Sequence, residues 1–125
     1  MSRTPRYKLE LHGNAANRLP LAWEDADGQP VDLTVGWGGA MQIRRFASSQ
    51  DALVSLTEQA GDDGQIELGA GGEVTLVLSP AALSKLPVWT CVYDVVLYPP
   101  GDTDRSQGIR LVEGRCVLSR GVTRG

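Results

Sequence analysis

Residues 63–97 constrain the fold of this chain more than any other stretch of the sequence. Ile66 and Leu68 alternate with polar neighbours, which is the period of a half-buried strand. A glycine-rich turn follows at residues 70–72, and a β-branched run continues over residues 73–78. Glycine suits such a turn because it adopts positive φ without steric cost. The pattern predicts a β-hairpin.

A short helical turn is expected directly after this hairpin. Ser79 is suited to cap the first free backbone N–H groups, and Pro80 has no N–H to leave unpaired at the first helical position. Pro87 ends the turn, so the helix is limited to about residues 80–86, from Pro80 to Leu86. Residues 88–97 then form the longest strand candidate. A short helix between two strands is typical of a chain that crosses between two sheets.

The rest of the chain repeats short apolar runs separated by turn residues, and it holds 15 glycines and 7 prolines. This pattern favours an all-β fold, and 125 residues suffice for one domain with one core. Pro20 restricts its strand to a sheet edge or a bulge. We expect a single β-sandwich domain over residues 1–125 with flexible tails at 1–5 and 120–125. Further strands are expected over residues 6–11, 19–24, 40–46, 53–57 and 109–118, with a break at the glycine run 36–39 and a strand or connector at 31–35.

The chain has two cysteines, Cys91 and Cys116. If residues 88–97 and 109–118 form a hairpin, counting along the two strands places these cysteines opposite each other. A disulfide between directly paired strands is strained, and a cytoplasm keeps thiols reduced. We therefore expect two free, buried thiols.

Charge and hydropathy exclude several classes of partner. The net charge of −3 and the pI near 5.0 argue against general nucleic-acid binding, which needs a positive surface. No apolar run is long enough to span a bilayer, and the basic N-terminus is followed by no hydrophobic signal core. We expect a protein that is made in a cytoplasm, is not secreted by a signal peptide and does not bind membranes.

The residue inventory contains no convincing catalytic or metal-binding constellation. His12 is the only histidine and falls near the end of an expected edge strand, so a histidine-based triad has little support. Asp25 and Asp27 resemble part of a calcium loop, but Asp27-Gly28 is better explained as a turn. Asp94 is expected to face outward or to pair with an arginine such as Arg115. We predict no enzyme activity, no cofactor and no metal site.

Aromatic and basic residues supply the candidate binding positions. Trp23 and Trp89 fall in apolar alternation, which favours the core over a sugar-stacking platform. Trp37 is flanked by glycines and is the tryptophan expected nearest the surface. Arg44 and Arg105 lie in basic spots that suit a solvated or partner-contacting face. The candidate binding residues are therefore Trp37, Arg44 and Arg105.

Seven pieces of the sequence, taken in order, resemble a known group of proteins. The first reads Leu-Ala-Trp-Glu-Asp-Ala-Asp-Gly-Gln-Pro-Val-Asp-Leu-Thr at residues 21–34. The others are residues 41–44, 64–68, 72–79, 92–95, 111–115 and 122–124. Their order and spacing resemble small proteins of tailed bacteriophages that are similar to the N-terminal domain of phage baseplate upper proteins, an immunoglobulin-like β-sandwich group. The resemblance covers about residues 19–124.

This resemblance implies an immunoglobulin-like antiparallel β-sandwich and a function in binding. It implies a non-enzymatic virion structural protein, a tail-tip, baseplate or fibre-attachment adaptor made in the host cytoplasm. Its partners are then other virion proteins, and it can also form homo-oligomers. Two alternatives stay open: a carbohydrate-binding or host-surface adhesion module, which needs exposed coplanar tryptophans, and a capsid decoration protein.

Overall fold

The computed structural model describes residues 7–12, 16–24, 27–86, 90–102 and 106–119. The expected tails at 1–5 and 120–125, together with Trp89 and Arg105, lie outside these residues. No helix within the described ranges combines the length and the apolar character that crossing a bilayer requires.

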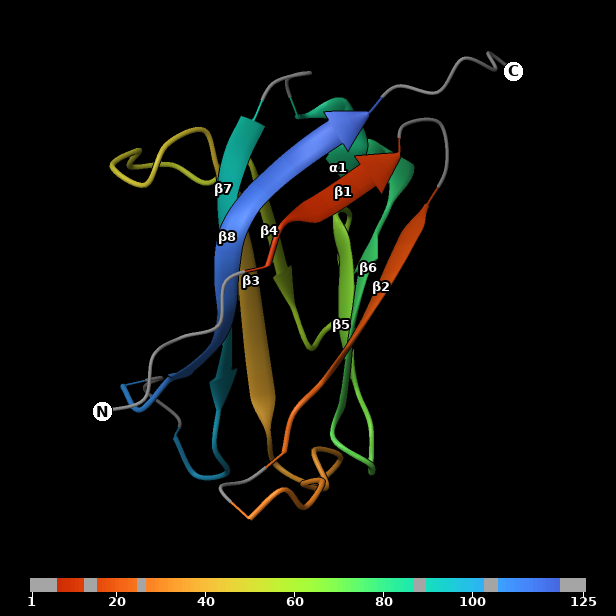
Figure 1. Ribbon diagram of the computed structural model, residues 1–125, viewed down its shortest axis with the longest axis vertical. Coiled ribbons are helices and arrows are strands. Elements are labelled where there is room, and N and C mark those ends of the chain that lie inside the picture. Colours follow the sequence, from red (N-terminus) through yellow and green to blue (C-terminus); the bar gives the residue numbers. More distant parts are fainter. Residues whose placement is uncertain (1–6, 13–15, 25–26, 87–89, 103–105, 120–125) are drawn as a thin grey trace.

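Two sheets pack face to face, as predicted for an all-β sandwich (Figure 1). The larger sheet has five strands in the order β1-β8-β7-β3-β4, and the smaller has three in the order β2-β6-β5. Pro20 lies on β2, at an edge of the smaller sheet, as its missing N–H requires. The strands are β1 (Leu9–His12), β2 (Asn17–Ala22), β3 (Gly38–Arg44), β4 (Val54–Thr57), β5 (Gly64–Leu68), β6 (Glu73–Leu78), β7 (Thr90–Tyr98) and β8 (Ile109–Ser119).

One pair of strands departs from the antiparallel arrangement. β1 pairs with β8 in parallel, with Leu9 opposite Cys116 and Leu11 opposite Leu118. All other named pairs in the described structure are antiparallel. A tight turn forces neighbouring strands to be antiparallel, but no turn joins the first strand to the last. Alternation in the sequence therefore indicates which side chains face inward and leaves the direction of this pairing open.

One local expectation is corrected and one open alternative is decided. The glycine run at 36–39 does not break the chain along its whole length, because β3 already begins at Gly38. Gly39 is buried, and a Cβ there would lie 3.6 Å from the Ile66 side chain, so a small residue fits this part of the core. Of the two alternatives expected for residues 31–35, the structure has the connector.

Helix α1 (Pro80–Ser84) forms where the Ser79-Pro80 signal predicts it. The Ser79 hydroxyl accepts a hydrogen bond from the Ala82 N–H at 3.2 Å, which is the expected N-cap. Ala82 and Leu83 are buried at one end of the core. The helix carries the chain from β6 in the smaller sheet to β7 in the larger one, which confirms the predicted crossover.

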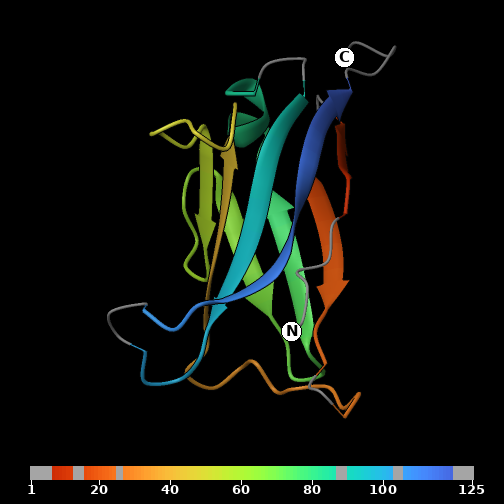
Figure 2. The same cartoon turned by 60° about the vertical axis from the view of Figure 1, so that its left-hand side comes forward.

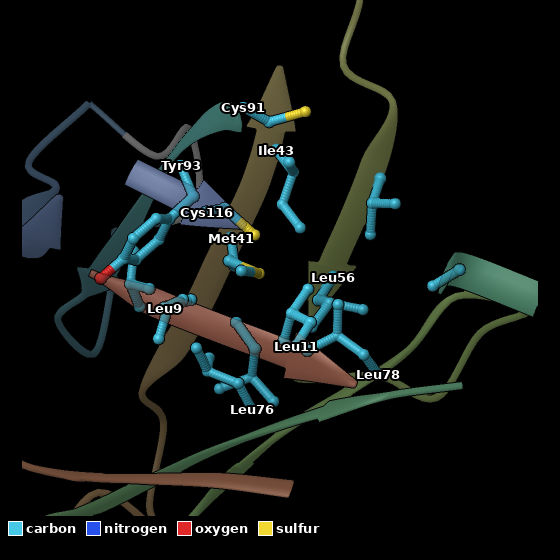
Figure 3. Packing of buried hydrophobic residues seen from close by; sticks show 14 of the residues in the cluster. Leu9, Leu11, Met41, Ile43, Leu56, Leu76, Leu78, Cys91, Tyr93 and Cys116 are labelled. Atoms are coloured by element: carbon cyan, nitrogen blue, oxygen red, sulfur yellow. The ribbon is translucent and has the colours of Figure 1, made fainter. Parts of the chain in front are cut away.

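The core lies between the sheets and is built from the inward-facing half of each strand (Figure 3). Cys91 and Cys116 lie opposite each other on β7 and β8, and both are free and buried, as predicted. Tyr93, on the next inward position of β7, is only 4% exposed. Fully buried apolar side chains fill the centre of the core, and they include Leu9, Leu11, Met41, Ile43, Leu56, Leu76 and Leu78.

Candidate functional site

The outer face of the five-stranded sheet carries ordered rows of side chains. Successive residues of a strand point to opposite faces, so the neighbours of buried Met41, Ile43, Cys91 and Tyr93 point away from the core. Figure 2 shows β7 (cyan) and β8 (blue) side by side toward the viewer. None of the described strands or helices lies over this outer face in that view.

Strand register places two arginines on either side of a valine. Arg44 on β3 lies opposite Val92 on β7, and Val92 lies opposite Arg115 on β8. These three residues form one row across the sheet, here called the arginine row. Neighbouring strands are about 4.8 Å apart, so the two arginines attach to the backbone roughly 10 Å from each other.

The next outward row carries the opposite charge. Gln42 on β3 lies opposite Asp94 on β7, and Asp94 lies opposite Glu113 on β8. This set, here called the acidic row, is two residues along the strands from the arginine row, a distance of about 6.7 Å. Both rows line a shallow depression of about 490 Å³ on the face.

Arg44 is held in place by neutral groups. Its guanidinium donates to the Ser49 carbonyl at 3.0 Å, to the Gln50 carbonyl at 2.7 Å and to Gln42 Oε1 at 2.5 Å. These bonds fasten the β3–β4 loop to the sheet and orient the side chain. No carboxylate of the described residues pairs with Arg44, so its charge is oriented but not neutralised.

Asp94 pairs with an arginine, as expected, but the arginine is Arg110. Arg110 Nε lies 3.7 Å from Asp94 Oδ2, and Arg110 Nη1 lies 3.6 Å from Glu113 Oε2. A bulge between Val95 and Val96 shifts the register and brings Arg110 toward these acids, whereas Arg115 lies opposite Val92. Both distances exceed those of close charge-assisted hydrogen bonds, so the acids keep capacity for further donors.

Arg115 is exposed, and its side chain makes no hydrogen bond or ion pair with the part of the chain that the structure describes. The matching surface of the smaller sheet differs. There Arg18 on β2 donates to Glu67 on β5 at 2.5 Å, across Val77 of β6. The smaller sheet therefore neutralises its outward arginine internally, and the larger sheet leaves one without a partner.

Trp37 lies at the other end of β3 from Arg44, so the structure does not bring these two predicted binding residues together. Trp37 is half-buried and packs edge-to-face on Trp23, with ring centroids 5.4 Å apart and planes at 62°. The pair is not a coplanar platform. A second depression of about 370 Å³, which Tyr98 also lines, lies beside Trp37. Arg105, the third predicted binding residue, lies outside the described residues.

The acidic turn residues have structural partners. Asp63 accepts the Ser55 N–H at 3.3 Å and pairs with Lys85 Nζ at 2.6 Å, so it links β4 to the residue that caps helix α1. Gly28 has φ near +80°, as the Asp27-Gly28 turn predicts. Within the described ranges, no three histidine, cysteine, aspartate or glutamate residues gather as metal ligands would. His12 is exposed at the end of β1, where its backbone N–H donates to Asn17 Oδ1 at 3.0 Å.

The two thiols are poor nucleophiles. Burial raises the pKa of Cys116 to about 12, and the neighbouring Cys91 contributes in the same direction. Burial also raises the pKa of Cys91, against a smaller opposing effect of Arg45. Since the thiolate is the reactive form, both cysteines act as small apolar side chains at neutral pH.

Sequence reasoning selected Arg44 but missed Val92, Glu113 and the free charge of Arg115. The signal was present, because outward positions alternate along residues 88–97 and 109–118 and the predicted hairpin aligns them. The bulge that shifts Arg110 could not be found from spacing alone.

Comparison with known proteins assigns the fold and goes no further. No protein-family model and no curated protein sequence matches this chain. Among solved structures, the chain is similar over its full length to Tim-1, with 13% identity, full coverage of both chains and a TM-score of 0.52. It is similar to a structure from photo-crosslinking analyses of multimeric cell-adhesive interactions of VGSC beta subunits, with 11% identity, 98% coverage of both chains and a TM-score of 0.51.

A third structure contains the extracellular domains of the voltage-gated sodium channel beta4 subunit, described as parallel homodimers with a role in cell–cell adhesion. The identity is 9%, the coverage is 98% of both chains and the TM-score is 0.48. With the two sheets described above, the likenesses to Tim-1 and to the VGSC beta subunits of the photo-crosslinking study define the fold class: an all-β sandwich of the immunoglobulin-like type, as predicted.

Proposed function

We propose that this chain is a non-enzymatic protein-binding module and that it binds through the outer face of its five-stranded sheet. The observation that carries the proposal is the arginine row, in which Arg44 is oriented and Arg115 is unpaired on either side of Val92 in an open depression. A half-buried apolar residue between one oriented and one unpaired cation offers both contact area and charge to a partner.

The sheet edges are less suited to binding than the face. β2 carries Pro20, which removes one backbone donor, and β1 has four residues with the Lys8–Glu10 pair beside it. On β4, the Ser55 N–H is already bonded to Asp63. Short, charged or capped edges resist strand addition, which favours the face of the larger sheet over the edges at β1, β2 and β4.

Within this class we propose a virion structural protein of a tailed bacteriophage, acting as a tail-tip, baseplate or fibre-attachment adaptor. The ordered sequence pieces over residues 19–124 support this assignment. The proposal includes other virion proteins as partners, and synthesis in the host cytoplasm. Capsid decoration is the alternative location in the particle. The cell-adhesive interactions named for the VGSC beta subunits are compatible with a sandwich of this shape that works by binding proteins.

Carbohydrate binding is the weaker alternative. Stacking on a sugar needs exposed rings in one plane, whereas Trp23 and Trp37 meet at 62° and are both half-buried against the core. We therefore place the binding function on the arginine row and not on the tryptophans.

Two matched substitutions test the proposed function. Val92→Glu puts a negative charge into the arginine row, and Val77→Glu makes the same change at a half-buried outward position of the smaller sheet. Each purified variant is incubated with proteins released from disassembled phage particles, and the bound proteins are identified by mass spectrometry.

We expect the wild type and Val77→Glu to retain the same virion protein, and Val92→Glu to lose it. Equal binding by both variants would place the binding site elsewhere. Absence of this protein from purified particles would refute the virion assignment.

A further inference from the structure

We propose that the outer face of the five-stranded sheet binds a second copy of this chain, in an antiparallel face-to-face dimer that sets Arg115 of each copy against Glu113 of the other. This inference rests on the proposed use of the same face for protein binding. It deepens that proposal by naming the partner and its orientation.

The arrangement of charge selects the orientation. The arginine row and the acidic row run parallel to each other across β3, β7 and β8, about 6.7 Å apart. A two-fold axis that runs between them, parallel to both, places the arginine row of one copy over the acidic row of the other. An axis along the strands would instead place each row over the same row of the other copy, so that like charges would face each other and repel.

The antiparallel arrangement pairs the individual side chains. Position along the row is preserved by the symmetry, so each Arg115 faces the Glu113 of the other copy, and this contact occurs twice. Each Asp94 faces the other copy's Val92, with Arg44 and Arg115 of that copy one strand to either side. The other copy therefore offers two arginines to Asp94 and one to Glu113, in addition to the loosely held Arg110.

A second copy matches the face better than an unrelated acidic ligand does. Such a ligand would satisfy Arg44 and Arg115, but it would also meet Asp94 and Glu113 on the adjacent row. Only a surface with the same two rows in reversed order satisfies both. This chain carries that surface.

The area of the face approaches what a dimer needs. The five strands have 4, 11, 9, 7 and 4 residues, and at about 3.3 Å per residue and 4.8 Å between strands they cover a projected area of roughly 550 Å², to which the relief of the side chains adds. Standard interfaces bury about 800 Å² on each partner. Outward residues on β3 are small or uncharged beyond the rows, as at Gly38 and Ala40, so the sheets can approach.

Charge exchange between Arg115 and Glu113 tests the inference. The single variants Arg115→Glu and Glu113→Arg each set like charges against each other twice in the dimer. We expect each to weaken self-association on the order of 100-fold in sedimentation equilibrium. An equimolar mixture of the two variants, and the double variant Arg115→Glu/Glu113→Arg, restore opposite charges at both contacts and should recover most of the affinity.

The Arg18→Glu variant is the matched control, because it changes an outward arginine on the smaller sheet. It should dimerise as the wild type does. Circular dichroism on every variant establishes that each is folded. The inference is overturned if the wild type is monomeric, or if the mixture and the double variant associate no better than the single variants.

The outcome separates this inference from the proposed function. A monomeric wild type that still binds a virion protein through a Val92-dependent contact overturns self-pairing alone. A charge-dependent dimer that is absent from particles overturns the virion function and supports self-pairing.

Discussion

Replacing Tyr93 by phenylalanine removes one hydroxyl group that holds Tyr7, just before β1, against the larger sheet. The buried Tyr93 hydroxyl donates to the Tyr7 carbonyl at 2.5 Å, and the Tyr7 N–H donates to the Glu113 carbonyl at 3.0 Å. The variant loses this hydrogen bond and leaves a partly buried carbonyl without it. We expect the free energy of unfolding at neutral pH to fall by about 1–2 kcal/mol.

The difference between wild type and variant should depend on pH in a specific way. Burial raises the pKa of Tyr93 to about 12, against an ordinary value of 10.0. The neutral phenol is therefore favoured in the folded state, and its stabilising effect is complete below pH 10. Between about pH 10 and 12 the unfolded chain releases the proton first, so the wild type loses roughly 1.4 kcal/mol of stability per pH unit, about 2.7 kcal/mol in total.

Urea denaturation of both proteins in buffers from neutral pH to about pH 12 measures this difference. The wild type should be the more stable protein at neutral pH, and the gap should close or reverse above pH 11. The neighbouring Cys116 also raises the pKa of Tyr93, so the two groups titrate together in the wild type, and Tyr93→Phe removes this coupling. A gap that stays constant across this range would refute the assigned hydrogen bond and its burial.

Two further predictions concern the core and one turn. Gly64→Ala should destabilise the protein by about 3 kcal/mol or more, because φ is +130° and the added Cβ would lie 1.8 Å from the Val77 carbonyl oxygen. Gly101→Ala, with φ +87° and no atom within 4 Å of the added Cβ, should cost only about 1–2 kcal/mol; equal melting temperatures for the two variants would contradict this. Cys91 and Cys116 should react with a thiol reagent at neutral pH only after urea unfolding, and rapid labelling of the native protein would show that they are not buried as described.

Local chemistry made much of the fold predictable from the sequence. Ser79 and Pro80 specify a helix start through their own side chains, and the alternation over residues 88–97 indicates which face is buried. Counting residues along the predicted hairpin was enough to place Cys91 opposite Cys116. Each of these features depends on residues that are close in sequence or joined by one turn.

Features that depend on distant contacts were not predictable in the same way. Gly39 belongs to a strand because it pairs with Leu97 on β7, and no local signal reports that distant pairing. The parallel pairing of β1 with β8 brings together the first and last strands of the described structure. The pairing of Arg110 with Asp94 follows from a bulge. Each outcome was decided by packing across the sandwich.

The proposed binding site shows the same division. Arg44 was selected as a basic residue, but its role depends on neighbours that lie on other strands. The glycines around Trp37 predict a binding position near the surface. In the structure Trp37 packs edge-to-face with Trp23, at the opposite end of β3 from Arg44. A row across three strands exists only once the register is known, which is why Val92 and Arg115 emerged from the structure.

Arginine footprinting measures most directly whether the outer face of the larger sheet is a binding surface. A dicarbonyl reagent is applied to the purified chain at low concentration and to the chain in assembled particles, and modified arginines are quantified by mass spectrometry. The account predicts that Arg115 is strongly protected in the assembly, while Arg18 on the smaller sheet reacts equally in both samples. Protection of Arg18 with undiminished reaction at Arg115 would contradict it.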